Sequence, residues 1–312
     1  MLVLGIDVGG TKAVCWLSNE RRDVIADMRG VGATLQAGGE AAVESALRQV
    51  IVPAVRVARE PISAICVGMA GVDRANEAGT VRAIVERLTH IPAVLVVNDA
   101  LIALEAGIES APGIVVVAGT GSIAYGRDAG GRAARAGGWG YVLGDEGSGY
   151  WIGRQALQAV VRAADGRGAA TALTPLVLEH FGVKRAQDLV QEVYFRLTQP
   201  SAIAGLSALV STAAAEGDSI ATTILDASAA ELTTAALAVA AQLKLDACPV
   251  LLSGGVFRSS PRLMSCVTAR LNEALPQVSV ELLKEEPVSG AVRLALALAE
   301  GRAAIPQYET RA

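Results

Sequence analysis

The 312-residue sequence is poor in aromatic residues and has no excess of basic ones, and these shortages exclude whole classes of partner. Aromatic residues make up 4% of the chain, too few for the stacking platforms that bind single-stranded nucleic acid. The 31 acidic residues outnumber the 27 lysines and arginines, which gives a net charge of −4 and no basic stripe to neutralise a phosphate backbone. We therefore expect no nucleic-acid partner.

Clustered cysteines and long apolar runs are also lacking. Cys15, Cys66, Cys248 and Cys266 are scattered and form no Cys-x-x-Cys pair, so we predict neither a disulfide framework nor a zinc site and interpret all four as core residues. Uncharged apolar stretches fall short of the roughly 18 residues that a membrane span needs. Asp7 interrupts the apolar start where a signal peptide needs an unbroken core. We expect no membrane partner and a cytoplasmic location.

The sequence does contain a regular alternation of strand and helix patterns. The expected elements are strands at 2–9, 11–18, 23–30 and 62–71, helices at 38–60 and 76–90, and a strand that Asn98 and Asp99 end ahead of a helix. The strand-glycine-strand template of residues 2–17 then returns at 113–128, and the chain is mainly helical from about residue 150. This weak internal repeat predicts two α/β halves that face each other across a cleft.

Both halves open with a glycine turn between two strands, Gly-Gly-Thr-Lys at 9–12 and Gly-Thr-Gly at 119–121. Such turns let successive backbone N–H groups point at one anion. Neither turn opens a helix as a Walker A loop or a dinucleotide fingerprint does, so the pair favours clamping a polyphosphate from two sides. Asp7, at a strand end beside the first turn, is well placed for Mg²⁺. A plain hairpin turn and a turn-capping aspartate are the structural alternatives.

Four separated segments resemble motifs of one known superfamily. In order and spacing, GIDVGGTK, VVNDALIAL, VVVAGTGSIAYG and LLSGGVF are similar to the phosphate, connecting and adenosine motifs of the sugar kinase, actin and heat-shock chaperone ATPases. The segment GGWGYVLGDEGSGYWIG resembles the signature of the branch that holds the N-acetylglucosamine kinases and the BadF/BadG/BcrA/BcrD ATPases. The resemblance spans residue 4 to about residue 299.

This resemblance implies an α/β fold of two ribonuclease H-like (actin-like ATPase) domains, each with a mixed five-stranded sheet, and an interdomain cleft. The N-terminal domain would comprise residues 1–112 and be completed by a C-terminal helix at about 291–312. Residues 113–290 would form the C-terminal domain.

The resemblance also implies the cofactors, ATP and Mg²⁺, and the residues that bind them. The ATP-binding residues would be Gly9, Gly10, Thr11, Lys12, Gly119, Thr120, Gly121, Gly254 and Gly255, the last two beside the adenosine. Asp7 would hold the magnesium ion. Strand alternation leaves open that Lys12 points to solvent instead.

The sugar site follows from the same resemblance. The residues implied to contact the sugar are Thr34, Asp99, Ser122, Gly138, Trp139, Gly140 and Asp145. Asp99 would be the catalytic base that orients the attacking hydroxyl, with an ordinary helix N-cap as the alternative. For the tryptophans the alternative is local core, which we expect of Trp151. For Asp145 and Glu146 it is a charge at a helix N-terminus, which we expect in part of Glu146. Thr34 stands where the N-acetylglucosamine kinases have an asparagine, so the identity of the sugar stays open.

The implied reaction is ATP-dependent transfer of the γ-phosphate to a hydroxyl, expected to be O6, of N-acetylglucosamine, glucosamine or a related amino sugar. A homodimer is common in this branch. The alternatives are an ATPase activator of a dehydratase or reductase that uses an iron-sulfur cluster, and a non-catalytic sugar sensor. The cysteines lie in strand or helix patterns away from the glycine loops, and Asp7 and Asp99 are both present, so the kinase is favoured.

Overall fold

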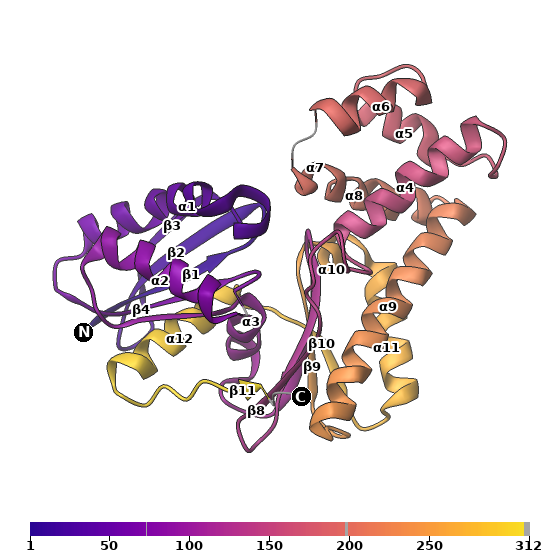
Figure 1. Cartoon of the computed structure of the whole chain (residues 1–312). Coiled ribbons are helices and arrows are strands. Elements are labelled where there is room, and N and C mark those ends of the chain that lie inside the picture. Colours follow the sequence, from indigo (N-terminus) through magenta and orange to yellow (C-terminus); the bar gives the residue numbers. More distant parts are fainter. Residues whose placement is uncertain (73, 197–198, 309–312) are drawn as a thin grey trace.

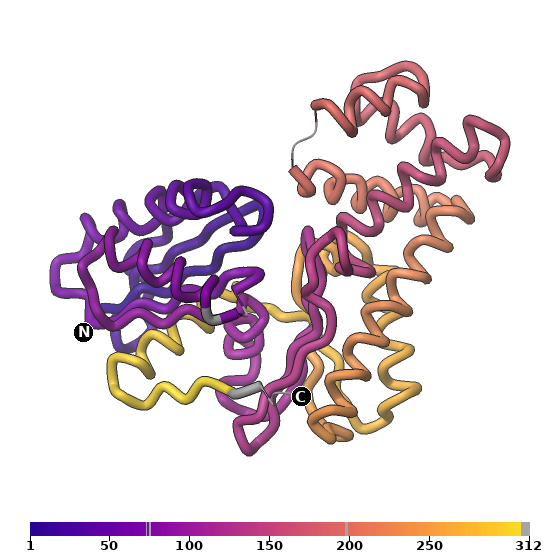
Figure 2. The backbone as a smooth tube through the Cα atoms, viewed as in Figure 1, coloured from indigo at the N-terminus to yellow at the C-terminus, as the bar shows by residue number. Residues whose placement is uncertain are grey.

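Two α/β lobes make up the structure, a computed structural model that describes residues 1–72, 74–196 and 199–308 (Figure 1). The chain leaves the first lobe after α3, builds the second lobe, and returns through α12 to pack on the first (Figure 2). The described helices and strands alternate within each lobe, as the sequence patterns predict. The fold class expected from the resemblance is confirmed.

The first lobe is built on a five-stranded mixed sheet with the order β3-β2-β1-β4-β5. Its strands are β1 (Leu2–Val8), β2 (Lys12–Asn19), β3 (Val24–Val31), β4 (Ile62–Met69) and β5 (Val94–Asn98). The central strand β1 is buried along its whole length, antiparallel to β2 and parallel to β4. A strand covered on both faces needs apolar residues at nearly every position, which explains the run LVLGIDV.

Helices cover both faces of this sheet. On one face lie α1 (Leu35–Val57) and α2 (Ala75–Thr89), and on the other lie α3 (Asp99–Ile108) and α12 (Pro287–Ala299). A Cβ at Gly5 would lie 2.5 Å from the backbone nitrogen of Val292, so α12 approaches β1 where no side chain fits. The last helix of the chain is thereby part of the first lobe.

The second lobe carries a six-stranded sheet with the order β10-β9-β6-β7-β8-β11, one strand more than expected. Its strands are β6 (Gly113–Ala118), β7 (Ser122–Arg127), β8 (Arg132–Gly137), β9 (Pro249–Ser253), β10 (Ser279–Leu282) and β11 (Gln307–Tyr308). The helix expected over about 291–312 ends at Ala299, because Gly301 adopts a left-handed conformation (φ +67°) that stops it. The freed tail supplies β11, which pairs with the edge strand β8.

The described helices of the second lobe lie either beyond the end of its sheet where β6 and β7 meet or along one face of that sheet (Figure 1). They are α4 (Gly149–Ala164), α5 (Leu173–His180), η1 (Ala186–Asp188), α6 (Leu189–Gln191), the π-helical η2 (Glu192–Arg196), α7 (Pro200–Ala204), α8 (Leu206–Ala215), α9 (Ser219–Leu243), α10 (Gly255–Ser259) and α11 (Pro261–Ala274). Of these, α9 packs along β7 and β8, with α11 beside it.

One helix departs from the expectation about apolar runs. By length and composition, the 25-residue α9 is apolar enough to cross a membrane. Half of its apolar window is buried inside the second lobe, against β7, β8 and α11. Core packing therefore accounts for the apolar composition.

The cysteines behave as core residues. Cys15, Cys66 and Cys248 are buried, and Cys266 is half-buried. Burial raises the pKa of the Cys248 thiol to about 11 and raises the pKa values of Cys15 and Cys66 further, so these groups are thiols at neutral pH.

Candidate active site

The two glycine turns lie against each other at the boundary between the lobes. A Cβ at Gly10 would be 3.8 Å from the Cβ and the Oγ1 of Thr120, which is ordinary van der Waals contact. Each turn is closed by its own backbone. The Gly9 N–H donates to the Lys12 carbonyl at 2.9 Å, and the Gly119 N–H donates to the Gly121 carbonyl at 2.9 Å. Two segments more than a hundred residues apart in sequence thus form one locus.

Backbone donors remain available at this locus. In the part of the chain that the structure describes, the N–H groups of Gly10, Thr11 and Thr120 donate to no other protein group. Successive N–H groups without a protein acceptor form the concavities that bind anions. The arrangement can therefore hold phosphate oxygens with neutral donors from both lobes.

The second turn is braced by the start of α4. The Gly149 N–H donates to the Gly119 carbonyl at 2.8 Å, and the Tyr150 N–H donates to the Thr120 carbonyl at 3.2 Å. The N-cap of α4 is Ser148, whose hydroxyl accepts from the Trp151 N–H at 3.1 Å. Glu146 is exposed and is not the helix cap.

Asp145 lies directly against the second turn. A Cβ at Gly121 would be 2.7 Å from its Oδ2, and the carboxylate is 8% exposed. Burial raises the pKa of Asp145 to about 6, although hydrogen bonds from the backbone N–H groups of Ser122 and Gly140 favour the ionised form. The Ser122 hydroxyl donates to the Glu146 carbonyl at 2.7 Å. The predicted sugar residues Ser122, Gly140 and Asp145 are therefore gathered in one place.

The loop at 138–140, which follows β8, lies beside Ser122 and Asp145, and we call these residues together the sugar wall. The Gly138 N–H donates to the Ser122 carbonyl at 2.9 Å, and both Gly138 (φ +69°) and Gly140 (φ +84°) adopt conformations that favour glycine. Between them, Trp139 is 60% exposed, so the core alternative is wrong for this residue. Trp151, by contrast, packs against the core of the second lobe, as expected.

Asp7 is the buried carboxylate of the first lobe. It is 9% exposed and sits near the end of β1, paired with Val14 on β2 and Gly68 on β4. Burial raises its pKa to about 6; the positive charge of Lys12 opposes this rise and the negative charge of Glu286 adds to it. A single buried carboxylate could hold a hydrated Mg²⁺, whose charge would favour the ionised form of Asp7, while the neighbouring N–H groups favour an anion such as phosphate.

The side chain of Lys12 is 54% exposed, and its Nζ lies 4.0 Å from Oε2 of Glu286. The lysine is thus at the rim of the first turn, paired with an acid, in line with the alternative that it points outward.

Asp99 and the first glycine turn lie at the same edge of the first sheet. In register, Val8 pairs with Met69 and Met69 pairs with Asn98, so the chain at Asp99 lies two strand spacings, about 10 Å, from the end of β1. The N-cap of α3 is Asn98, whose Oδ1 accepts from the Ala100 N–H at 2.8 Å. The N-cap alternative is therefore wrong for Asp99, the half-buried first residue of the helix.

Two further predicted contacts have local structural roles. Thr34 is the N-cap of α1, with its hydroxyl accepting from the Ala37 N–H at 3.3 Å. Gly254 (φ +109°) follows β9, and a Cβ there would lie 2.1 Å from the Ala118 carbonyl oxygen, so its glycine is required by the approach of two strand ends. Gly255 faces open space.

Sequence reasoning missed two residues beside the first turn. A Cβ at Gly32 would lie 2.1 Å from the Gly9 carbonyl oxygen, so the chain after β3 presses on the turn. Glu286, the N-cap residue of α12, binds Arg29 with both carboxylate oxygens, at 2.6 and 3.1 Å. A glycine in the segment RGVGA could have signalled the first contact, but no local pattern relates residue 29 to residue 286.

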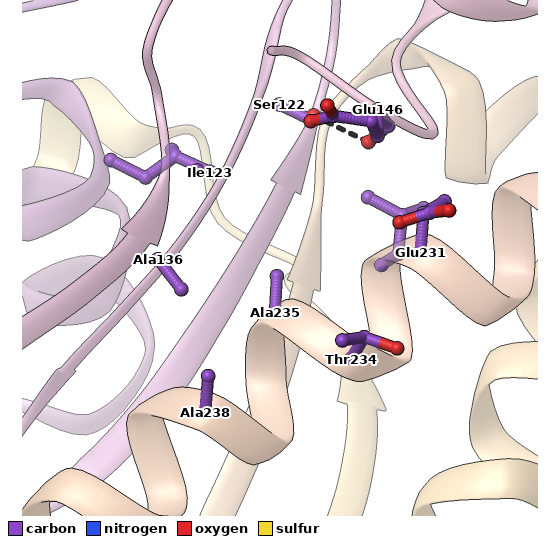
Figure 3. Close-up of a pocket in the computed structure, with 10 residues that line it drawn as sticks. Ser122, Ile123, Ala136, Glu146, Glu231, Thr234, Ala235 and Ala238 are labelled. Atoms are coloured by element: carbon purple, nitrogen blue, oxygen red, sulfur yellow. Dashed lines mark hydrogen bonds between the residues drawn. The ribbon is translucent and has the colours of Figure 1, made fainter.

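A cavity of about 180 Å³ lies behind the wall rather than between the two turns (Figure 3). It separates α9 from the ends of β7 and β8, and Glu146 and Glu231 contribute carboxylates to its lining. The Ser122 to Glu146 hydrogen bond closes one side of it.

Comparison with known proteins agrees with this geometry. The model of the BadF/BadG/BcrA/BcrD ATPase family matches residues 4–295. The chain belongs to this family. The match runs from β1 into α12 and so includes both lobes and both glycine turns.

Curated and solved relatives match over almost the whole chain. An N-acetylmuramic acid/N-acetylglucosamine kinase of Clostridium acetobutylicum is 35% identical, with 94% of this chain and 97% of that protein covered. An N-acetyl-D-glucosamine kinase of Dictyostelium discoideum is 31% identical, with coverage of 95% and 98%. The solved structure of a candidate N-acetylglucosamine kinase of Chromobacterium violaceum has a TM-score of 0.75 at 28% identity, covering 96% of this chain and 98% of that one.

Proposed function

We propose that this protein is an ATP-dependent kinase that phosphorylates N-acetylglucosamine or a closely related amino sugar on its primary hydroxyl, O6. The observation that carries the proposal is the approach of Gly10 to Thr120, close enough that a Cβ on Gly10 would touch that side chain, because it brings two sets of backbone donors from opposite lobes to one locus. Relatives of this family with 35% and 31% identity are named as kinases of N-acetylglucosamine, one of them also of N-acetylmuramic acid, which supports the choice of substrate class.

In this proposal the two turns hold the nucleotide tail. The N–H groups of Gly10, Thr11 and Thr120 bind β- and γ-phosphate oxygens, and the threonine hydroxyls add neutral donors. Phosphoryl transfer passes through a loose transition state and depends mainly on positioning and charge stabilisation. The two turns already approach each other in this structure, and closure of the lobes around the substrates would exclude water.

Asp7 is the residue that would hold Mg²⁺. The ion, when bound, neutralises charge on the phosphates as they separate. The chain contributes the Asp7 carboxylate near the end of the buried central strand β1. Asp7 is 9% exposed, and the charges of Lys12 and Glu286 lie nearby.

Asp99 would accept a hydrogen bond from the sugar hydroxyl and take its proton as the bond to phosphorus forms. It lies at the same sheet edge as Asp7, so the attacking oxygen and the phosphate would be brought together from the ends of β5 and β1, two strands apart. Gly138, Trp139 and Asp145 would bind the remaining face of the sugar, since a carboxylate can accept from two hydroxyls and the glycine loop exposes backbone groups. A homodimer and a cytoplasmic location are also part of the proposal.

The state of the cysteines favours the kinase over the iron-sulfur activator. Cluster ligation needs accessible thiolates. Cys15 and Cys66 are buried in the first sheet with raised pKa values, which disfavours both access and ionisation.

The test is ADP release with a panel of hexoses and amino sugars, repeated with Asp99→Asn. We expect turnover of N-acetylglucosamine and a fall in kcat of about 10²- to 10⁴-fold in the variant. Glu109→Gln, at the exposed far end of the same helix, is the matched control and should keep kcat. Turnover of no sugar, or equal kcat in wild type and Asp99→Asn, would overturn the proposal. NMR of the product assigns the phosphorylated oxygen.

A further inference from the structure

A buried ion pair joins α3 to the sheet of the second lobe. Glu105 on α3 binds Arg127, the last residue of β7, and both side chains are 5% exposed. The α3 helix lies between the two sheets (Figure 1), and its apolar residues share one core with Ile123 and Tyr125 of β7. Taking two opposite charges out of water can cost as much as their attraction returns, so stability alone is a weak explanation for such a pair.

Both partners also bind residues 109–112, the segment in which the chain passes from α3 to β6, which we call the first crossing. The Ser110 N–H donates to Oε2 of Glu105 at 3.1 Å. Nε and Nη2 of Arg127 donate to the Ala111 carbonyl at 3.2 and 3.0 Å. Ser110 has a φ of +36°, in the left-handed region that a residue other than glycine adopts at an energetic cost. Such a backbone persists only where its surroundings hold it, so the ion pair fixes the path of the first crossing.

The pair lies at the far end of two elements that begin at the proposed site. Asp99 is the first residue of α3, and Glu105 follows about 9 Å further along the helix. Ser122 opens β7 directly after the second glycine turn, and Arg127 ends the same strand about 17 Å away. Because α3 packs on β6 and β7, the contact between Glu105 and Arg127 governs how the helix lies on the strand and hence where Asp99 lies relative to the turn.

We propose that Glu105 and Arg127 are positioning residues for phosphoryl transfer. Their pair fixes the first crossing and the position of α3 on β7, and so aligns the Asp99 carboxylate with the phosphate that the second turn holds. The proposal rests on the proposed function and goes beyond it, because neither residue is among those that contact ATP or the sugar. Transfer between two bound groups is sensitive to shifts of about 1 Å in their alignment.

The alternative role for the pair is structural, as one contact among many in the core between the two sheets. A structural contact would change kcat through a general loss of the fold, and its effect would be the same whether Asp99 is present or not. A positioning pair acts through Asp99, so its effect on kcat should vanish once Asp99 has been replaced. A double-mutant cycle of the pair and Asp99 separates the two roles.

The experiment replaces the pair by apolar residues of similar volume, Glu105→Leu with Arg127→Met, in the wild type and in Asp99→Asn. Such replacements of buried ion pairs often keep or raise stability, and Ser110 and Ala111 are exposed, so their freed backbone groups can bind water. We expect a melting temperature close to that of the wild type and a kcat about 10- to 100-fold lower. KM for the sugar should stay within about threefold, because the sugar wall belongs to the second lobe. In Asp99→Asn the same replacement should change kcat less than about threefold.

A second variant covers the case in which the double replacement does not fold. Arg127→Lys keeps a cation beside Glu105, but it gives up the forked donors that reach the Ala111 carbonyl. We expect it to fold and to lower kcat about 3- to 10-fold. This fall should also vanish in Asp99→Asn.

The matched control is Arg22→Gln with Glu109→Gln, which removes an exposed ion pair, 2.8 Å long, from the same crossing and should keep kcat within about twofold. Wild-type kcat in the folded pair variants, or a loss of kcat that is as large in Asp99→Asn as in the wild type, would overturn this inference and leave the proposed function standing. A wild type that phosphorylates no amino sugar would remove the proposed function, and this inference with it.

Discussion

The two glycine turns have similar backbone geometry, but different contacts hold each of them in place. The turn at 119–121 is held by the α4 backbone on one side and by the buried Asp145 carboxylate on the other. The turn at 9–12 is closed by one backbone bond and bordered by the exposed pair of Lys12 and Glu286. The turn of the second lobe is therefore the more firmly braced of the two, and we call it the rigid cradle. The turn of the first lobe has charged side chains at its edge, and we call it the adjustable cradle.

The two buried carboxylates show the same contrast. Asp7 and Asp145 both have a pKa raised to about 6 by burial. Asp145 receives backbone N–H donors from Ser122 and Gly140, so its negative charge is partly compensated by the protein itself. For Asp7, only the positive charge of Lys12 lowers the pKa and favours ionisation. The protein itself therefore compensates more of the charge of Asp145 than of Asp7, which agrees with the proposal that Asp7 holds a cation.

The largest expected effect concerns these carboxylates. Their folded pKa of about 6 lies above the value of 3.8 for an unperturbed aspartate, so the folded protein retains protons that the unfolded chain releases between those values. Stability is therefore fully present below pH 3.8 and decreases as pH rises through about 6, by up to about 3 kcal/mol for each group. Asp7→Asn should raise the free energy of unfolding at pH 7, and the gain should vanish near pH 4.

Comparing Asp7→Asn with Asp145→Asn in urea unfolding curves sharpens the contrast. The gain should be smaller for Asp145→Asn, because an amide loses one acceptor for the two backbone donors. Added Mg²⁺ should stabilise the wild type at pH 7 and leave Asp7→Asn unaffected. Equal gains for the two variants, or magnesium stabilisation that survives Asp7→Asn, would contradict the roles assigned to these acids.

The second prediction breaks the rigid cradle. In Gly121→Ala the new methyl group would meet Oδ2 of Asp145 at 2.7 Å, too close without a shift of that carboxylate. We expect a loss of about 1–3 kcal/mol in stability, as for other overpacked sites, together with a higher KM for the sugar. Gly119→Ala is the matched control, since a Cβ there meets nothing within 4 Å. Thermal unfolding and sugar titration check both, and a Gly121→Ala protein with wild-type KM would contradict the placement of Asp145.

The third prediction tests the adjustable cradle. Gly10→Ala places a methyl group 3.8 Å from Thr120, which the fold tolerates but which fills space intended for phosphate. We expect an unchanged melting temperature and a KM for ATP about tenfold higher, equivalent to ~1.4 kcal/mol. If KM for ATP stayed the same in a folded Gly10→Ala protein, the phosphates would have to lie elsewhere.

The smallest effect is expected at the rim. Glu286 pairs with Lys12 at 4.0 Å and with Arg29 at the surface, and surface ion pairs contribute about 0–1 kcal/mol each. Glu286→Gln should therefore change KM for ATP by less than about fivefold, and the neighbouring Glu285→Gln, which removes a partner of Arg293 instead, should leave it unchanged. A steady-state ATP titration measures both. A Glu286→Gln change as large as that of Gly10→Ala would mean that the rim, rather than the backbone, binds the nucleotide.

Local patterns predicted the parts of the site that depend on one stretch of chain. The strand-turn-strand templates gave both cradles, and strand ends gave Asp7 and Asp99, because a turn and a buried strand are encoded by adjacent residues. Contacts between distant segments had no such signal. The approach of Gly254 to Ala118, the Arg29 to Glu286 bond and the return of the tail as β11 each join segments that only the folded sheets bring together.

The residue types alone predicted local roles less well than the place of each residue in the fold. The apolar α9 passes the test for a membrane span because it is a core helix, and Asp99 resembled an N-cap although Asn98, one residue earlier, holds that role. The stacking of Arg135 on Trp139 depends on a strand register that the sequence alone does not fix.

The most direct test of the account is a crystal structure of the protein with a non-hydrolysable ATP analogue, Mg²⁺ and N-acetylglucosamine. The account predicts β- and γ-phosphate oxygens within hydrogen-bond distance of the Thr11 and Thr120 N–H groups, and a sugar hydroxyl about 2.6–3.2 Å from an Asp99 carboxylate oxygen. Phosphates bound away from either turn, or a sugar whose hydroxyls all lie out of reach of Asp99, would contradict it.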